Sequence, residues 1–260
     1  MSKLASAALL AGALLSDAAQ AQGPRKPTVV LVHGAFADAS SWNGVTERLV
    51  GDGYTVVAAA NPLRGVRADA RYVSDIVASI NGPVVLVGHS YGGAVISAAA
   101  NAHRNVRSLV FVAAFAPDRG ETAAELAGRF PGGTLGQALA PPVTLSGGGV
   151  DLYIDQGRFH AQFAHDLPAG QAAAMAASQR PIAEAALTEA AGEPAWKALP
   201  SWFIYGSGDR NIPAAGLAFM AKRAGARRTV VVDGASHVVM VSHPRAVADI
   251  VEQAAGQARP

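Results

Sequence analysis

Short runs of apolar and β-branched residues recur along the chain, at 28–32, 55–59, 84–87, 109–113, 202–205 and 229–232. Most of these runs are continuously apolar, which is the pattern of strands buried on both faces of a sheet. Between them, apolar residues recur at helical spacing, as at Val73, Ile76, Val77 and Ile80, and at Val247, Ile250, Val251 and Ala254. The alternation predicts an α/β fold with a mostly parallel central sheet flanked by helices.

The alternation stops between residues 116 and about 197, where no run has the pattern of a buried strand. Turns rich in glycine and proline and two alanine-rich helical stretches occupy this interval, with a predicted hairpin at 143–145 and 152–154. A separate second domain is the alternative, but about 80 residues of this composition would form only a thin core. We therefore interpret the interval as a cap inserted into a single domain at 22–260.

Residues 1–21 have the order of a secretory signal peptide. Lys3 precedes an apolar run from Leu4 to Leu15, and a polar stretch then ends in Ala-Gln-Ala at Ala21. The apolar run is too short to span a bilayer as a permanent anchor. We expect cleavage before Gln22, export to the periplasm or the medium, and no stable insertion in a membrane.

Composition narrows the function further. The chain has 260 residues, half of them hydrophobic, and its 21 basic and 19 acidic side chains give a formal charge of +2. Because no stretch concentrates lysine and arginine, we expect no nucleic-acid partner. The absence of cysteine excludes a disulfide, a thiolate nucleophile and a cysteine-type metal site. We expect no cofactor and no metal, and the sequence specifies no oligomeric state.

The segment from Gly88 to Gly92 has the pattern G-x-S-x-G with Ser90 at its centre. The pentapeptide alone is a weak signal in a chain with 28 glycines, but its position between a predicted strand and a predicted helix is specific. Glycines two residues on either side remove side chains that would collide at a strained turn. We predict that Ser90 is a nucleophile at the positive end of the following helix.

Four segments carry a resemblance to a known family: Leu31-Val32-His33-Gly34-Ala35-Phe36, Gly88-His89-Ser90-Tyr91-Gly92-Gly93, Gly206-Ser207-Gly208-Asp209 and Gly234-Ala235-Ser236-His237. Over residues 28–255 the chain resembles the α/β-hydrolase superfamily, and especially its small capped branch. That branch contains plant methylesterases, hydroxynitrile lyases and many bacterial esterases. The resemblance implies a serine, histidine and aspartate triad beneath a cap.

A serine hydroxyl needs a histidine to accept its proton, and that histidine needs an acceptor that fixes its tautomer. His237 follows the last strand run and precedes the C-terminal helix, where the family carries its base. The alternative is His243, which precedes Pro244 at a helix start and fits a capping role better. His103, His160 and His165 are interpreted as surface polar residues.

The resemblance places the acid at Asp209, after the strand run 202–205. A minority of related enzymes carry the acid one strand earlier, and Asp118 occupies that place here. Asp118 stays open as the alternative, although its Pro-Asp-Arg-Gly turn favours aspartate for local reasons.

A tetrahedral intermediate needs two backbone N–H donors aimed at its oxygen. One is expected at Tyr91, the residue after the nucleophile. The resemblance puts the other at Ala35, with Phe36 as the alternative. We expect His33 to brace this loop and Phe36 to contact substrate.

Serine at position 90, where related dehalogenases and epoxide hydrolases carry aspartate, favours acyl transfer to water through an acyl-enzyme. The predicted substrate is an ester or lactone first and an amide second. The aromatic residues of the first loop and the cap favour a small, largely apolar substrate, although each is typical of a core: Phe36, Trp42, Tyr153, Phe159 and Phe163.

Two alternatives from other classes stay open. The first is a hydroxynitrile lyase, but the plant enzymes pair the base with a lysine, whereas Val238, Val239 and Met240 follow His237 here. The second is a binding protein of the same fold that has lost turnover, because a fold alone does not specify activity.

Overall fold

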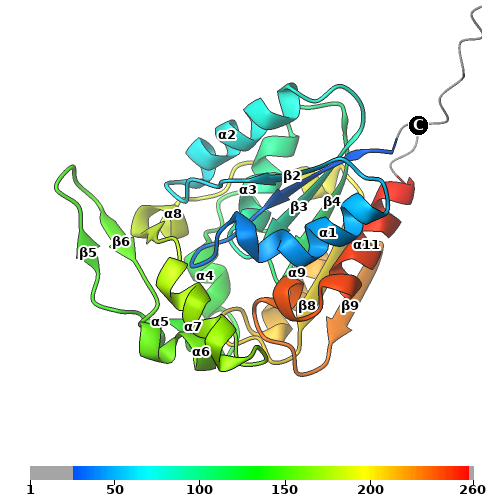
Figure 1. Ribbon diagram of the computed structural model, residues 1–260. Helices are drawn as coiled ribbons and strands as arrows, with labels where there is room; N and C mark the ends of the chain where they lie inside the picture. The colour runs from blue at the N-terminus through cyan, green and yellow to red at the C-terminus, as the bar shows by residue number, and fades with distance from the viewer. Residues whose placement is uncertain (1–25, 258–260) are drawn as a thin grey trace, which may run out of the picture.

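A computed structural model describes residues 26–257 and is built around a six-stranded sheet of order β2-β1-β3-β4-β8-β9 (Figure 1). Its strands are β1 (Thr28–Val32), β2 (Val56–Ala59), β3 (Val84–His89), β4 (Val106–Val112), β8 (Ser201–Gly206) and β9 (Arg228–Val232). Every neighbouring pair is parallel. The predicted α/β fold class with its parallel central sheet is confirmed.

The helices lie on both faces of the sheet. On one face α2 (Val66–Ala78) packs against α3 (Gly92–Ala100), and on the other α1 (Asn43–Gly51) packs against α11 (Pro244–Gln257) (Figure 1). The remaining core helices are η1 (Ala39–Trp42), α9 (Ala214–Arg223) and α10 (Val239–Ser242). The apolar positions that predicted α11 are buried, which explains its amphipathic pattern.

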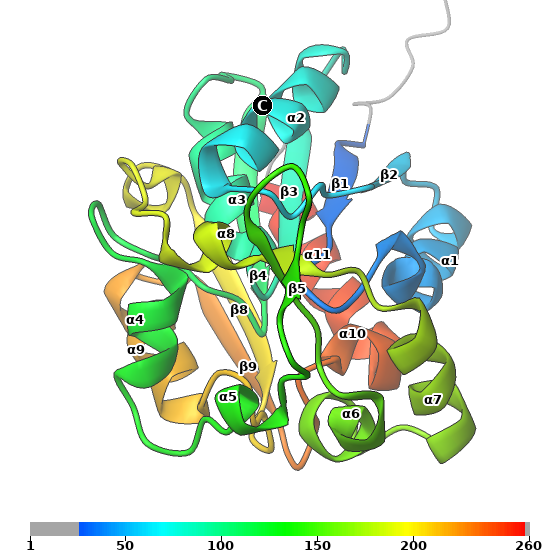
Figure 2. The same cartoon turned by 90° about the vertical axis from the view of Figure 1, so that its left-hand side faces the viewer.

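The interval between β4 and β8 holds most of the remaining elements. They are α4 (Ala123–Gly128), α5 (Leu135–Ala138), β5 (Val143–Thr144), β6 (Val150–Leu152), α6 (Gln156–Phe163), α7 (Ala169–Ser178), β7 (Ile182–Ala183), α8 (Glu184–Thr188) and η2 (Ala195–Lys197). In Figure 2 this segment extends across the front of the molecule and below the sheet. We call residues 116–197 the cap.

The predicted hairpin in the cap is present, but its strands have other bounds. Val143 pairs with Asp151 and Thr144 with Val150, so the second strand begins at Val150 and not at the expected position 152. A third strand, β7, pairs with β6 and was not predicted. The loop before α2 ties this small sheet to the core, since Arg64 forms a 2.6 Å ion pair with Asp151.

The parallel strands deliver four loops to one edge of the sheet, because their carboxyl ends all lie there. These loops follow β1, β3, β8 and β9, and they carry Ala35, Ser90, Asp209 and His237. The order reverses at β1, which has β2 on one side and β3 on the other. A site at this edge is the arrangement that open α/β sheets favour.

The expected signal peptide lies outside the described residues, so cleavage before Gln22 stays a prediction. Between residues 26 and 257, no helix has both the length and the apolar composition needed to cross a membrane.

Candidate active site

Ser90 stands on a strained turn between β3 and α3. Its φ is 52°, in the left-handed region that residues other than glycine rarely adopt. The flanking glycines have no room for side chains: a Cβ on Gly88 would lie 2.6 Å from the carbonyl oxygen of Gly92, and one on Gly93 would lie 2.3 Å from that of Phe115. The Ser90 carbonyl accepts hydrogen bonds from the N–H groups of Gly93 and Phe115 at 3.0 and 3.1 Å. Close packing from three segments therefore sustains the strain.

Asp209 and His237 form a buried pair. Nδ1 of His237 lies 2.6 Å from Oδ2 of Asp209, and both side chains are fully shielded from solvent. The other carboxylate oxygen accepts hydrogen bonds from the N–H groups of Asn211 and Ile212 at 2.8 and 3.0 Å. The carboxylate thus fixes the proton on Nδ1 and leaves Nε2 as an acceptor. Nε2 is buried and has no hydrogen-bond partner among residues 26–257.

The loops that carry these two residues are in direct contact. The N–H of Gly208 donates to the carbonyl of Ala235 at 3.1 Å. A Cβ on Gly206 would lie only 2.0 Å from the same carbonyl oxygen, so the loops can approach this closely only with glycine there. We call the loop that carries Asp209, after β8, the acid loop, and the loop that carries His237, after β9, the base loop.

His89 is a second buried histidine beside His237, and the sequence did not single it out. Its Nε2 donates to the carbonyl of His237 at 3.1 Å, and the two ring centroids are 4.8 Å apart. Burial, and then the nearby His237, hold the pKa of His89 well below its usual value of 6.5. His89 therefore stays neutral and supports the backbone of His237.

The loop after β1 presses against the nucleophile. A Cβ on Gly34 would lie 2.6 Å from Cβ of Ser90 and 2.8 Å from the carbonyl oxygen of His89. The Phe36 N–H is already bound to the carbonyl of Arg180 at 2.9 Å. The N–H of Phe36 is therefore not free to bind the oxyanion of a tetrahedral intermediate. This favours the N–H of Ala35 as the second donor.

His33 braces this loop. Its Nδ1 lies 2.9 Å from the carbonyl oxygen of Gly34, and its own carbonyl accepts a 2.9 Å hydrogen bond from Nδ2 of Asn61. Burial lowers the pKa of His33, which keeps the ring neutral.

Tyr91 is anchored through its side chain by a carboxylate that the sequence analysis did not identify. Its hydroxyl donates to Oδ2 of Asp69 at 2.8 Å, and Asp69 also accepts from the N–H groups of Arg64 and Gly65. Asp69 is fully buried, and this burial raises its pKa. The backbone N–H of Tyr91 is thereby held at the start of α3.

A cavity of about 60 Å³ opens onto Ser90 and is also lined by Ala35 and Tyr91. The rest of its lining is apolar except for Asn211: Phe36, Phe115, Ala123, Ala124, Ala127, Leu135, Leu187 and Ile212. Cap helices α4, α5 and α8 supply five of these residues. We call this space the nucleophile cavity.

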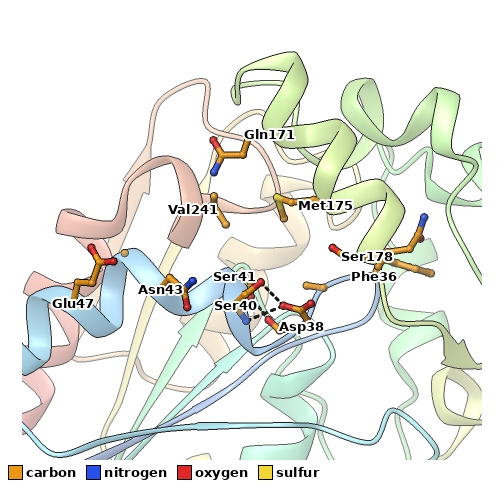
Figure 3. Close-up of a pocket in the computed structure, with 13 residues that line it drawn as sticks. Phe36, Asp38, Ser40, Ser41, Asn43, Glu47, Gln171, Met175, Ser178 and Val241 are labelled. Atoms are coloured by element: carbon orange, nitrogen blue, oxygen red, sulfur yellow. Dashed lines mark hydrogen bonds between the residues drawn. The ribbon is translucent and has the colours of Figure 1, made fainter.

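A larger cavity of about 420 Å³ lies between η1, α1 and α7 and contains no member of the predicted triad. Figure 3 shows Gln171 and Met175 of α7 on one side of it and Ser41, Asn43 and Glu47 on the other. Phe36 lines both cavities.

The alternative acid and base lie in other surroundings. Asp118 forms a 2.6 Å ion pair with Lys197 and accepts from the N–H of Arg119 within its turn. His243 ends α10, and its Nδ1 lies 2.9 Å from Oγ of Ser242. The structure brings Asp209, and not Asp118, to His237.

His103, His160 and His165, interpreted as surface polar residues, are each partly buried and hydrogen bonded. Of the aromatic residues considered for substrate contact, only Phe36 lines the nucleophile cavity within the described part of the chain. The ring of Phe163 packs against His237 at 5.2 Å between centroids.

The sequence profile of the alpha/beta hydrolase family matches residues 29–250. The chain belongs to this family. This α/β hydrolase is 29% identical over 247 residues to a pimeloyl-[acyl-carrier protein] methyl ester esterase of Aeromonas hydrophila, a match that covers 88% of this chain and 96% of that protein.

Solved structures share the fold of this α/β hydrolase. Polyneuridine aldehyde esterase superposes with a TM-score of 0.76 at 18% identity, covering 88% of this chain and 99% of the other. A pyrethroid hydrolase from Sphingobium faniae superposes with a TM-score of 0.69 at 23% identity, covering 88% and 97%. In the described part of this α/β hydrolase, no group of three or more acidic, histidine or cysteine side chains could hold a metal ion.

Proposed function

We propose that this chain is a serine hydrolase that cleaves a carboxylic ester or lactone through an acyl-enzyme. The observation that carries the proposal is the buried Asp209–His237 pair at 2.6 Å, at the same sheet edge as a strained serine. Neither feature stabilises the fold, since the positive φ of Ser90 and the unpartnered Nε2 of His237 both lower the free energy of unfolding.

In the proposed reaction, His237 Nε2 takes the proton of the Ser90 hydroxyl as its oxygen attacks the ester carbonyl. Asp209 stabilises the imidazolium that forms. The N–H groups of Ala35 and Tyr91 stabilise the oxyanion, and His237 returns the proton to the leaving alcohol. Water then attacks the acyl-enzyme, with His237 again as base, and releases the acid.

The relatives support ester hydrolysis. The curated relative is named for a methyl ester, and the two structural neighbours are named an esterase and a pyrethroid hydrolase. The match to the alpha/beta hydrolase family, which covers residues 29–250, also supports a hydrolase activity.

The two cavities suggest an asymmetric substrate. The nucleophile cavity is small and almost wholly apolar, so it suits a short alkyl or acyl group. The larger cavity between η1, α1 and α7 presents amides, hydroxyls and the carboxylates of Asp38 and Glu47, with no basic side chain in its lining. We propose that the other side of the ester is polar and uncharged or cationic.

The lyase alternative requires a lysine beside the base. Lys197 is paired with Asp118 and Glu193, and the contacts of the His237 ring include those with Asp209, His89 and Phe163. The other alternative, a binding protein of the same fold that has lost turnover, is tested by a single activity assay.

The test is burst release of p-nitrophenol from p-nitrophenyl acetate, beside cyanide release from mandelonitrile. We expect a burst, no cyanide, and loss of both burst and turnover in Ser90→Ala with an unchanged circular dichroism spectrum. Ser90→Ala activity within about tenfold of the parent would refute the nucleophile. Absence of any burst or turnover in the parent with short esters would favour the silent binding protein.

A further inference from the structure

The end of cap helix α6 and the turn that follows it bind both catalytic loops. His165 Nε2 donates to the carbonyl of Gly208 at 3.0 Å, and Oδ2 of Asp166 accepts from the N–H of Ser236 at 3.0 Å. Gly208 directly precedes Asp209, and Ser236 directly precedes His237. Two neighbouring residues of the cap thus each bond to one loop of the acid–base pair.

The same helix also holds the acid loop on the far side of Asp209. Nε2 of Gln162 donates to the carbonyl of Arg210 at 2.9 Å and to Oδ1 of Asn211 at 2.8 Å. Gln162 is buried, so these bonds are shielded from water. In Figure 2, α6 lies at the lower end of the sheet, beside the loops that follow β8 and β9.

Some other bonds between cap and core are remote from the acid and base loops. Arg64 binds Asp151 at 2.6 Å, and Leu63 accepts from the N–H of Ala183 at 3.0 Å. Both of these lie at the loop before α2, and neither involves the acid or base loop. The cap is therefore attached to the core at several places, and one group of these attachments is built around Asp209 and His237.

We propose that Gln162, His165 and Asp166 are positioning residues that hold the acid and base loops in register. The proposal rests on the proposed function for its kinetic consequence, but not for its structural one. The two loops also bind each other directly, through the bond from Gly208 to Ala235 and through Ser207, whose Oγ donates to Asp233 and accepts from the N–H of Gly234. Residues 162–166 of the cap contact both the acid loop and the base loop. The 2.6 Å contact between Asp209 and His237 therefore depends on the cap.

The test compares two cap carboxylates that bind the core. Asp166→Ala removes the acceptor for the Ser236 N–H, and Asp151→Ala removes the ion pair with Arg64. We expect Asp166→Ala to lower kcat by about tenfold to a hundredfold, as small misplacements of catalytic groups do, with little change in KM. Asp151→Ala should keep the parent kcat, because the ion pair between Arg64 and Asp151 involves neither the acid loop nor the base loop.

Conservative variants separate positioning from general damage. Asn in Asp166→Asn keeps an oxygen that accepts from Ser236, and Gln in His165→Gln keeps an N–H that reaches Gly208. Both should recover most of the kcat lost in Asp166→Ala and His165→Ala. If Asp166→Ala does not fold, the His165 pair provides the same comparison on the acid loop.

A spectroscopic readout makes the proposal independent of turnover. The proton on His237 Nδ1 should give a far-downfield proton resonance, assigned by its loss in Asp209→Asn. We expect this resonance to broaden or move in Asp166→Ala and to stay unchanged in Asp151→Ala. An unchanged resonance in Asp166→Ala, or equal kcat in the two alanine variants, overturns the proposal. Absence of both burst and turnover in the parent overturns only the proposed hydrolase activity.

Discussion

Nδ1 of His237 and Oδ2 of Asp209 are 2.6 Å apart in a site closed to solvent, while the second oxygen of Asp209 is held by two backbone N–H groups. In Asp209→Asn the amide oxygen would keep those two N–H groups, so the NH₂ group would face His237. The ring would then carry its proton on Nε2, where the serine needs an acceptor. We expect kcat for p-nitrophenyl acetate to fall by something like 10⁴-fold.

The control for this prediction is Asp118→Asn. Asp118 binds Lys197 and its own turn, and asparagine suits such a turn equally well. Its kcat and melting temperature should stay close to the parent values. A crippled Asp118→Asn beside an active Asp209→Asn would move the acid one strand earlier.

Gly34→Ala should damage activity through contact with the nucleophile. The new methyl group would lie 2.6 Å from Cβ of Ser90 and 2.8 Å from the carbonyl oxygen of His89, so the loop or the serine must move. A displacement of this size predicts a fall of about a hundredfold in kcat/KM. Gly51→Ala is the matched control, since its methyl group would meet no atom within 4 Å. Equal kinetics for the two variants would contradict the close packing at Ser90.

Tyr91→Phe distinguishes the backbone of Tyr91 from its side chain. Removing the hydroxyl takes one donor from the buried carboxylate of Asp69, so we expect a loss of about 1–3 kcal/mol in the free energy of unfolding. The kcat should change little, because the proposed donor to the oxyanion is the N–H. Urea unfolding and steady-state kinetics measure both effects, with Tyr72→Phe on the exposed face of α2 as control. A large kcat loss without destabilisation would assign the hydroxyl itself to catalysis.

The neutral His89 predicts how stability depends on pH. Its folded-state pKa lies well below the unfolded value of 6.5, so below that pH the unfolded chain takes up a proton that the folded protein does not. Stability is therefore expected to decrease as the pH falls through 6.5, and His33 contributes in the same direction. In His89→Gln the drop in melting temperature between about pH 7.5 and pH 5.5 should be smaller than in the parent. An equal drop in both proteins would show that His89 does not carry this dependence.

Export gives a prediction outside the described residues. If residues 1–21 are a signal peptide, the mature protein begins at Gln22. N-terminal sequencing of protein from the periplasm or medium measures this directly. Met1 retained on protein from the cytoplasm would refute the leader.

The sheet was predictable where burial on both faces makes a strand continuously apolar. β1 has its predicted bounds, and β3 is longer only by Gly88 and His89, which are buried and still pair with β4. β4 begins three residues before its predicted start because the exposed Arg107 interrupts the apolar run. The two-residue strand β7 is too short to produce a pattern.

The site was predictable where residues belong to a local motif, as Ser90, Asp209 and His237 do. Gln162, His165 and Asp166 bind loops that lie far away in the sequence, and such partners leave no local signal. Asp69 had a weak signal, because it shares the buried stripe of α2 with Val73 and Val77. A carboxylate on an apolar stripe indicates a buried partner, which here is Tyr91.

The contacts of α6 and the turn after it with both the acid loop and the base loop limit which segments can be exchanged between related proteins. Chimeras that import a foreign α4 or α5 would bring new walls for the nucleophile cavity, since those helices supply Ala123, Ala124, Ala127 and Leu135. A foreign α6 would also have to match the acid and base loops of its new host. Exchange of α4 or α5 is therefore expected to change the nucleophile cavity, whereas α6 is expected to be exchangeable only together with the loops that it contacts.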